Sequence, residues 1–134
     1  MKSIKHLALV ILVGLILTSC ASTANFPTSS IAPAADITAT KKMTKNNNYN
    51  IKLTVKSLAE ASRLDPPKKN YSVWIITDDN QTKNIGQLIF KNAEKAVLNT
   101  TTAFNVKEIF ITAEDEEGLT YPRGTEISRT TFSK

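Results

Sequence analysis

The sequence predicts an all-β protein, an antiparallel β-sandwich of six to seven strands behind a signal peptide. Three observations predict this class. Segments rich in β-branched and aromatic residues recur at spacings of about ten residues between Tyr49 and Phe132. Turn-forming residues separate these segments, and no convincing long helix lies between them. The chain has 134 residues, a length at which one domain is the default.

The N-terminal residues have the three-part layout of a bacterial export signal. Lys2 and Lys5 supply positive charge, and residues 7–17 form an unbroken stretch of apolar residues and glycine. We therefore expect residues 1–19 to be a signal peptide that is removed. Its end resembles a lipobox, at which signal peptidase cuts bacterial lipoproteins just before an acylated cysteine, and the matching residues are Leu17, Thr18, Ser19 and Cys20.

Cys20 is the only cysteine, and we expect it to carry diacylglycerol and an N-linked acyl chain. Together these chains exceed the two-signal threshold for stable membrane anchoring. By similarity to lipoprotein sorting in enteric bacteria, Ala21 after the cysteine favours the outer membrane, facing the periplasm, as the place in the cell envelope. Two alternatives stay open: ordinary signal cleavage after Ala21 or Ala24, and an uncleaved N-terminal anchor.

Residues 20–46 predict a flexible tether between the lipid and the folded domain, which is expected over residues 47–134. From Ala21 to Thr40, fifteen of twenty residues are Ala, Ser, Thr or Pro. Such a composition offers few apolar groups to a core. A short strand from Asp36 to Thr40 is an alternative within this segment.

The first strand of the domain is the clearest, because apolar and polar residues alternate from Tyr49 to Lys56. Ser57 to Leu64 fits a capping box, but Pro66 and Pro67 follow at once, so we expect a structured loop. Residues 71–77 are apolar on both faces, which is typical of a central strand.

The next strand, residues 84–90, should form a hairpin with 71–77, and Gly86 suggests a bulge or a close approach within it. Further strands are predicted at residues 96–102, 106–114 and 126–132. The bulky aromatic side chains expected in the structural core are Tyr71, Trp74 and Phe110.

Four short motifs resemble, in order, those of the extracytoplasmic domain of anti-sigma factors of the K type and of related envelope lipoproteins: Tyr71-Ser72-Val73-Trp74-Ile75, Ile85-Gly86-Gln87-Leu88, Phe110-Ile111-Thr112-Ala113-Glu114 and Pro122-Arg123-Gly124. The resemblance implies an immunoglobulin-like β-sandwich. In the anti-sigma proteins a zinc-type helical domain and a membrane span precede this domain, and both are missing here. Sigma-factor binding is therefore not carried over.

The available side chains exclude several kinds of chemistry. His6 lies in the signal and Cys20 is acylated, so the mature domain has no histidine and no free thiol. Catalysis by Ser-His-Asp or Cys-His groups and zinc sites with histidine or thiolate ligands each lose a required group. We expect no enzyme and no cofactor beyond the lipid. The chain has 17 basic and 12 acidic residues, and removal of Lys2 and Lys5 with the signal leaves 15 basic residues. This mild excess gives no support for nucleic-acid binding.

The sequence thus favours a non-catalytic, membrane-anchored envelope lipoprotein that acts as a binding or interaction module, with envelope sensing as one role. Its partner would be an envelope protein or a glycan. The loops 57–70 and 114–124 are expected to share one rim. The acidic run in the second loop is the candidate interaction segment, formed by Glu114, Asp115, Glu116 and Glu117.

The alternative is a calcium- or glycan-binding periplasmic module. Asp78 and Asp79 follow a predicted strand, and clustered carboxylates are the ligands that calcium prefers, but their spacing is not that of an EF-hand. Tyr71 and Trp74 could form a platform for a sugar. Aromatic residues within a central strand more often belong to a core.

Overall fold

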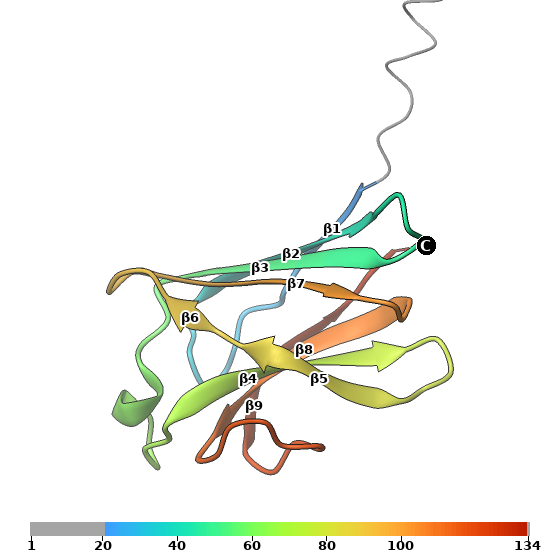
Figure 1. Ribbon diagram of the computed structural model, residues 1–134. Helices are drawn as coiled ribbons and strands as arrows, with labels where there is room; N and C mark the ends of the chain where they lie inside the picture. The colour runs from blue at the N-terminus through green and yellow to red at the C-terminus, as the bar shows by residue number, and fades with distance from the viewer. Residues whose placement is uncertain (1–20, 134) are drawn as a thin grey trace, which may run out of the picture.

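The computed structural model describes residues 21–133, which form a β-sandwich of two antiparallel sheets (Figure 1). A single turn of 3-10 helix, η2 (Ala61–Arg63), lies in the loop after the third strand. The strands are β1 (Ala21–Asn25), β2 (Asp36–Met43), β3 (Tyr49–Lys56), β4 (Asn70–Thr77), β5 (Thr82–Gln87), β6 (Ile89–Phe90), β7 (Lys95–Thr102), β8 (Val106–Glu114) and β9 (Thr125–Thr131).

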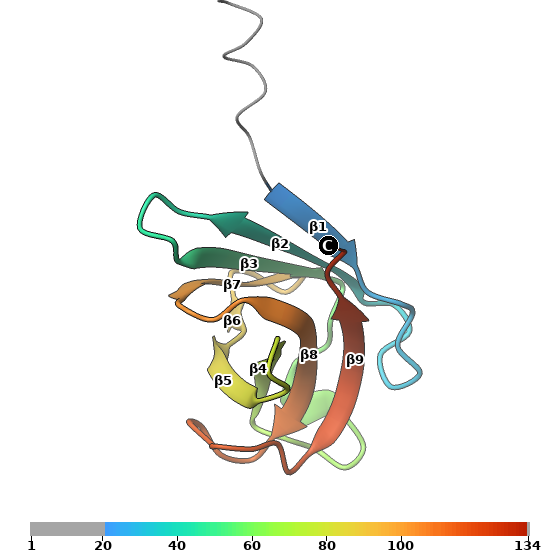
Figure 2. The ribbon, with the colours of Figure 1, turned by 90° about the vertical axis from the view of Figure 1, so that its right-hand side faces the viewer.

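The strand order is that of an immunoglobulin-like sandwich. One sheet has the order β1-β2-β3-β7-β6 and the other β5-β4-β8-β9. If β2 is strand A, the first sheet continues as A-B-E-D and the second contains C-F-G, with β5 as an added edge strand and β1 as an extra strand outside A. Figure 2 shows the two sheets facing each other across the core. The predicted fold class is confirmed.

The inward side chains of both sheets form one apolar core. Strand β3 alternates as expected and buries Ile51, Leu53 and Val55, while its lysines face solvent. The central strands β4 and β8 are paired from Asn70 with Glu114 to Thr77 with Val106. Their core residues are Tyr71, Val73, Ile75, Ile109, Ile111 and Ala113.

The predicted tether is wrong over residues 21–43. Strand β1 pairs with β2 from Ala21 opposite Lys42 to Asn25 opposite Thr38, and β2 pairs with β3 along its whole length. The short strand proposed at 36–40 is therefore present and extends to Met43. Ile37 and Ala39 are buried in the core although their neighbours are small and polar. The strand forms from these small residues because only one face of β2 packs on the core, while the threonines of its other face stay partly exposed.

The predicted strand 84–90 is divided between the two sheets. β5 pairs with β4 in the expected hairpin, with a register shift between Val73 and Trp74, whereas β6 pairs with β7 in the other sheet. Gly86 has a φ of +134°, and a Cβ there would lie 3.1 Å from Cδ1 of Leu98. Both the bulge and the close approach that Gly86 predicted are thus found where the chain crosses between sheets.

Candidate functional site

Two loops meet at one end of the sandwich. Residues 57–69 connect β3 to β4, and residues 115–124 connect β8 to β9. The backbone N–H of Lys69 donates to the carbonyl oxygen of Glu114 at 2.9 Å, and Lys68 Nζ lies 3.3 Å from Asp115 Oδ2. The loops therefore share a rim, as their positions between the predicted strands indicated. In Figure 1 the first loop is the green segment at the lower left, and the second is the orange-red segment at the bottom.

The first loop is held by backbone and side-chain contacts with the sandwich. Ser57 has a positive φ of 59°, and its N–H donates to the carbonyl of Glu94 at 2.8 Å. The Tyr71 hydroxyl donates to the carbonyl of Ala59 at 2.6 Å, and burial raises the pKa of Tyr71 to about 12. The expected structured loop is found, and its only helical element is the single turn η2. The capping box that Ser57 to Glu60 fits does not begin a helix at Ser57, whose N–H bonds to Glu94 instead.

The second loop is closed at its base by Glu114 and Gly124. Glu114 Oε2 accepts hydrogen bonds from the Thr112 hydroxyl at 2.6 Å and from the N–H of Arg123 at 3.2 Å. Its side chain is only 2% exposed. A Cβ at position 124 would lie 1.8 Å from the carbonyl oxygen of Ala113, so this approach requires glycine.

Glu114 must therefore be removed from the predicted interaction segment. A buried carboxylate persists only when hydrogen bonds replace its water, and Thr112 and the N–H of Arg123 provide them. The other three acidic residues, Asp115, Glu116 and Glu117, are exposed.

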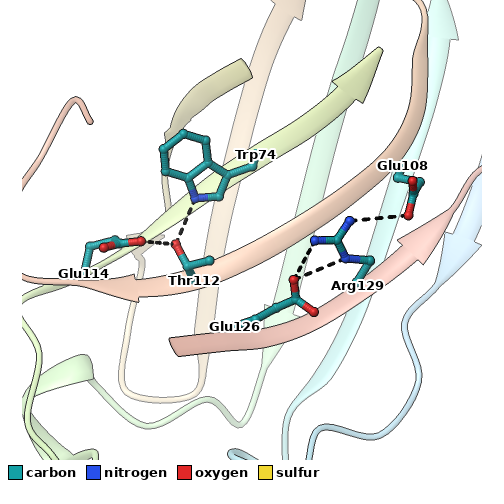
Figure 3. A network of polar contacts seen from close by, with 6 residues as sticks. All are labelled: Trp74, Glu108, Thr112, Glu114, Glu126 and Arg129. Atoms are coloured by element: carbon teal, nitrogen blue, oxygen red, sulfur yellow. Dashed lines mark hydrogen bonds and ion pairs between the residues drawn. The ribbon is translucent and has the colours of Figure 1, made fainter. Parts of the chain in front are cut away.

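The outer face of the β5-β4-β8-β9 sheet carries a second packed layer (Figure 3). The Trp74 and Phe110 rings stack with centroids 6.3 Å apart and planes inclined by 16°. Arg129 covers Phe110, with its guanidinium carbon 4.1 Å from the ring centroid, and forms ion pairs with Glu126 and Glu108. Hydrogen bonding to Glu126 raises the pKa of Arg129.

All three aromatic residues expected in the core are buried, but their places differ. Tyr71 lies between the sheets, whereas Trp74 and Phe110 occupy the outer layer. The Trp74 indole N–H donates to Thr112 Oγ1 at 2.8 Å, which connects this layer through Glu114 to the rim (Figure 3). Since Tyr71 and Trp74 are both buried, neither presents a ring face to solvent as a sugar platform.

A groove of about 540 Å³ lies along the rim, beside a smaller hollow of about 260 Å³ that contains Glu114, Asp115, Glu116 and Arg123. Lys68 borders both. We call the larger one the rim groove, and its charged and amide side chains are Glu60, Lys68, Lys69, Asn70, Gln87 and Glu117. Glu117 belongs to the predicted interaction segment, and residues 60 and 68–70 belong to the predicted loop 57–70. Gln87 was not predicted, because it comes from the end of β5 and only the fold brings it to the rim.

The rim groove offers charges of both signs and amide groups, which suit recognition of a polar surface. Within residues 21–133 there is no histidine, no cysteine and no group of three potential metal ligands. The same residues contain no helix long and apolar enough to span a bilayer.

The calcium candidates lie at the opposite end of the sandwich. Asp78 Oδ2 accepts a hydrogen bond from Asn105 Nδ2 at 2.6 Å, while Asp79 Oδ1 accepts one from the Thr77 hydroxyl. The two carboxylates thus bond to different partners, and neither belongs to a cluster of potential ligands among the residues described.

The residues of the predicted lipobox lie outside the described part of the chain: Leu17, Thr18, Ser19 and Cys20. Comparison of the chain with models of protein families, with curated proteins and with solved structures finds no match. The similarity to the extracytoplasmic domain of anti-sigma factors stays a prediction.

Proposed function

We propose that this protein is a non-catalytic lipoprotein of the cell envelope that is anchored through Cys20 and binds another envelope protein at the rim groove. The observation that carries the proposal is the placement of the two joined loops, 57–69 and 115–124, at the end of the sandwich away from Ala21. An anchored chain would then present the groove away from the membrane.

The position of β1 supports anchoring at Cys20. Cleavage before Cys20 leaves β1 whole, whereas ordinary cleavage after Ala24 would remove most of it. Ala24 is 6% exposed and pairs with Ala39 of β2. Removal of residues 21–24 would therefore uncover the edge of β2, so the domain favours the lipoprotein cleavage site over that alternative.

The side chains that line the rim groove support binding rather than catalysis. Its lysines and glutamates are suited to ion pairs and hydrogen bonds with a partner, and loops on a rigid β-scaffold are a common place for recognition. The predicted likeness to extracytoplasmic anti-sigma domains agrees with an envelope role. Sigma-factor binding is not part of this proposal.

Site-specific photo-crosslinking in native membranes tests the proposal. A crosslinker at Glu117, which lines the rim groove, should capture one envelope protein, and Lys69→Glu should abolish that capture. Lys52→Glu is the matched control, because Lys52 is also exposed but lies on the outer face of β3. Capture that is equal in both variants contradicts the rim assignment. Capture of glycan, or a melting temperature that rises with calcium concentration, would support the alternative module instead.

A further inference from the structure

The end of the sandwich that carries Ala21 is formed by strand ends from both sheets (Figure 1). Ala21 pairs with Lys42, Tyr49 pairs with Thr102, and Thr77 pairs with Val106. The turns 44–48, 78–81 and 103–105 therefore lie at the same end of the sandwich as the first residue of β1. We call this surface the Ala21 end; it comprises residues 21–22, 42–49, 77–83 and 102–107.

The Ala21 end exposes apolar side chains among lysines. Met43 and Phe104 are 49% and 43% exposed, although both are large hydrophobic residues. Lys83 Nζ lies 5.2 Å from the centroid of the Phe104 ring. The neighbouring Lys42, Lys45 and Lys107 are exposed, and the acidic residues here are Asp78 and Asp79. The end therefore carries an excess of positive charge.

Lys41 belongs to the base of this end rather than to its free surface. Its Nζ donates to the carbonyl of Val106 at 2.9 Å and lies over the rings of Tyr49 and Phe132. Burial lowers the pKa of Lys41, and the nearby Asp78 opposes this effect. Lys41 thus joins the two sheets and fixes the position of the exposed groups around it.

The chain leaves almost no distance between this surface and the proposed anchor. Cys20 directly precedes Ala21, which is already the first residue of β1, and one residue spans at most about 3.6 Å. Acyl chains on Cys20 would hold the Ala21 end against the bilayer surface. The charge of this end is complementary to anionic phospholipid headgroups.

We propose that the Ala21 end docks on the phospholipid surface of the membrane in which Cys20 is anchored, with Met43 and Phe104 at the headgroup level and the lysines on anionic headgroups. Large apolar side chains with flanking lysines are the usual composition of surfaces that lie at a membrane interface. This inference rests on the proposed function and adds a fixed orientation to it. The rim groove would face away from the lipid.

Fluorescence quenching on vesicles tests the orientation. The acylated protein is reconstituted in phosphatidylethanolamine and phosphatidylglycerol that carry a headgroup nitroxide, with a fluorophore on Asn46→Cys at the Ala21 end or on Ser62→Cys at the rim groove. Both positions are exposed. We expect quenching at position 46 to exceed that at position 62 several-fold. Equal quenching in a protein that is shown by mass to be acylated would overturn the inference and leave the anchor standing.

Charge reversal separates lipid docking from simple proximity. Lys42→Glu with Lys45→Glu should reduce quenching at position 46 at least twofold, whereas the control Lys91→Glu with Lys95→Glu changes exposed lysines outside the Ala21 end and should leave it unchanged. An equal response of the two double variants would overturn the role of the lysines and with it the inference. A protein without acyl chains would overturn both the proposed anchor and the orientation that rests on it.

Discussion

Trp74 donates its indole N–H to the hydroxyl oxygen of Thr112 over 2.8 Å, on the outer face of the four-stranded sheet. In antibody domains the tryptophan of the corresponding strand packs in the inter-sheet core. Here the hydroxyl of Thr112 also donates to Glu114, which receives the N–H of Arg123. The outer layer and the base of the second loop are therefore one connected unit.

Thr112→Val should destabilise the domain by about 2 kcal/mol, because it leaves the buried Trp74 N–H and the Glu114 carboxylate without this partner. Urea unfolding measures the effect. Thr101→Val is the matched control, since Thr101 is an exposed strand residue, and we expect its unfolding free energy to change by less than about 0.5 kcal/mol. Equal losses would show that the Thr112 hydroxyl has no special role.

Gly124→Ala should cost more than about 4 kcal/mol, because its Cβ would meet the Ala113 carbonyl oxygen at 1.8 Å and the backbone would have to move. Gly118→Ala is the comparison: Gly118 has a φ of +65° but no atom within 4 Å of an added Cβ, so only conformational strain of about 1 kcal/mol is expected. Thermal melts rank the two variants. The reverse order would contradict the close packing at the base of the second loop.

Two isoleucines of the segment whose composition predicts a tether should differ in their contribution to stability, because Ile37 lies in β2 and Ile31 in the loop before it. Ile37 is 3% exposed and Ile31 is 45% exposed. Ile37→Ala should destabilise by about 3 kcal/mol through lost burial and a cavity. Ile31→Ala should change the unfolding free energy by less than about 0.5 kcal/mol. If neither substitution alters chemical unfolding, residues 21–43 do not form part of the folded domain.

Stability should also depend on alkaline pH through Tyr71. Burial raises its pKa from 10.0 to about 12, so the folded state favours the neutral phenol. This contribution is fully present below pH 10, the unfolded value, and is lost as the pH rises to about 12. In Tyr71→Phe, the ultraviolet titration should lose the tyrosinate component near pH 12. Retention of that component would assign it to another tyrosine.

Much of the fold was predictable because its signals are local. Strand β8 has the bounds predicted from its apolar run, and β3 follows from strict alternation. Strand β1 was missed since it buries only Ala24, and a small residue gives no recognisable period. The sequence could not predict which face of the sheet carries Trp74 either. Strand β4 is apolar on both faces, so its residues show no alternation that would tell the core face from the outer face.

The candidate site was predictable only in part. The strand order placed the loops 57–69 and 115–124 at one end, but four consecutive acidic residues look alike in sequence. Glu114 differs from Asp115 only through its contacts with Thr112 and the N–H of Arg123, which come from residues brought together by the fold. The rim groove depends in the same way on Gln87, which contributes from the end of β5 and lies outside both predicted loops.

The most direct test of the account is the intact mass of the protein purified from the membranes of its native cell. We predict a polypeptide that begins at Cys20 and carries the added mass of diacylglycerol and one N-linked acyl chain. A membrane fraction that holds this species, and loses it in Cys20→Ser, would support the anchor on which the proposed function rests. An unmodified chain that begins after Ala21 or Ala24, or one that retains Met1, would contradict it.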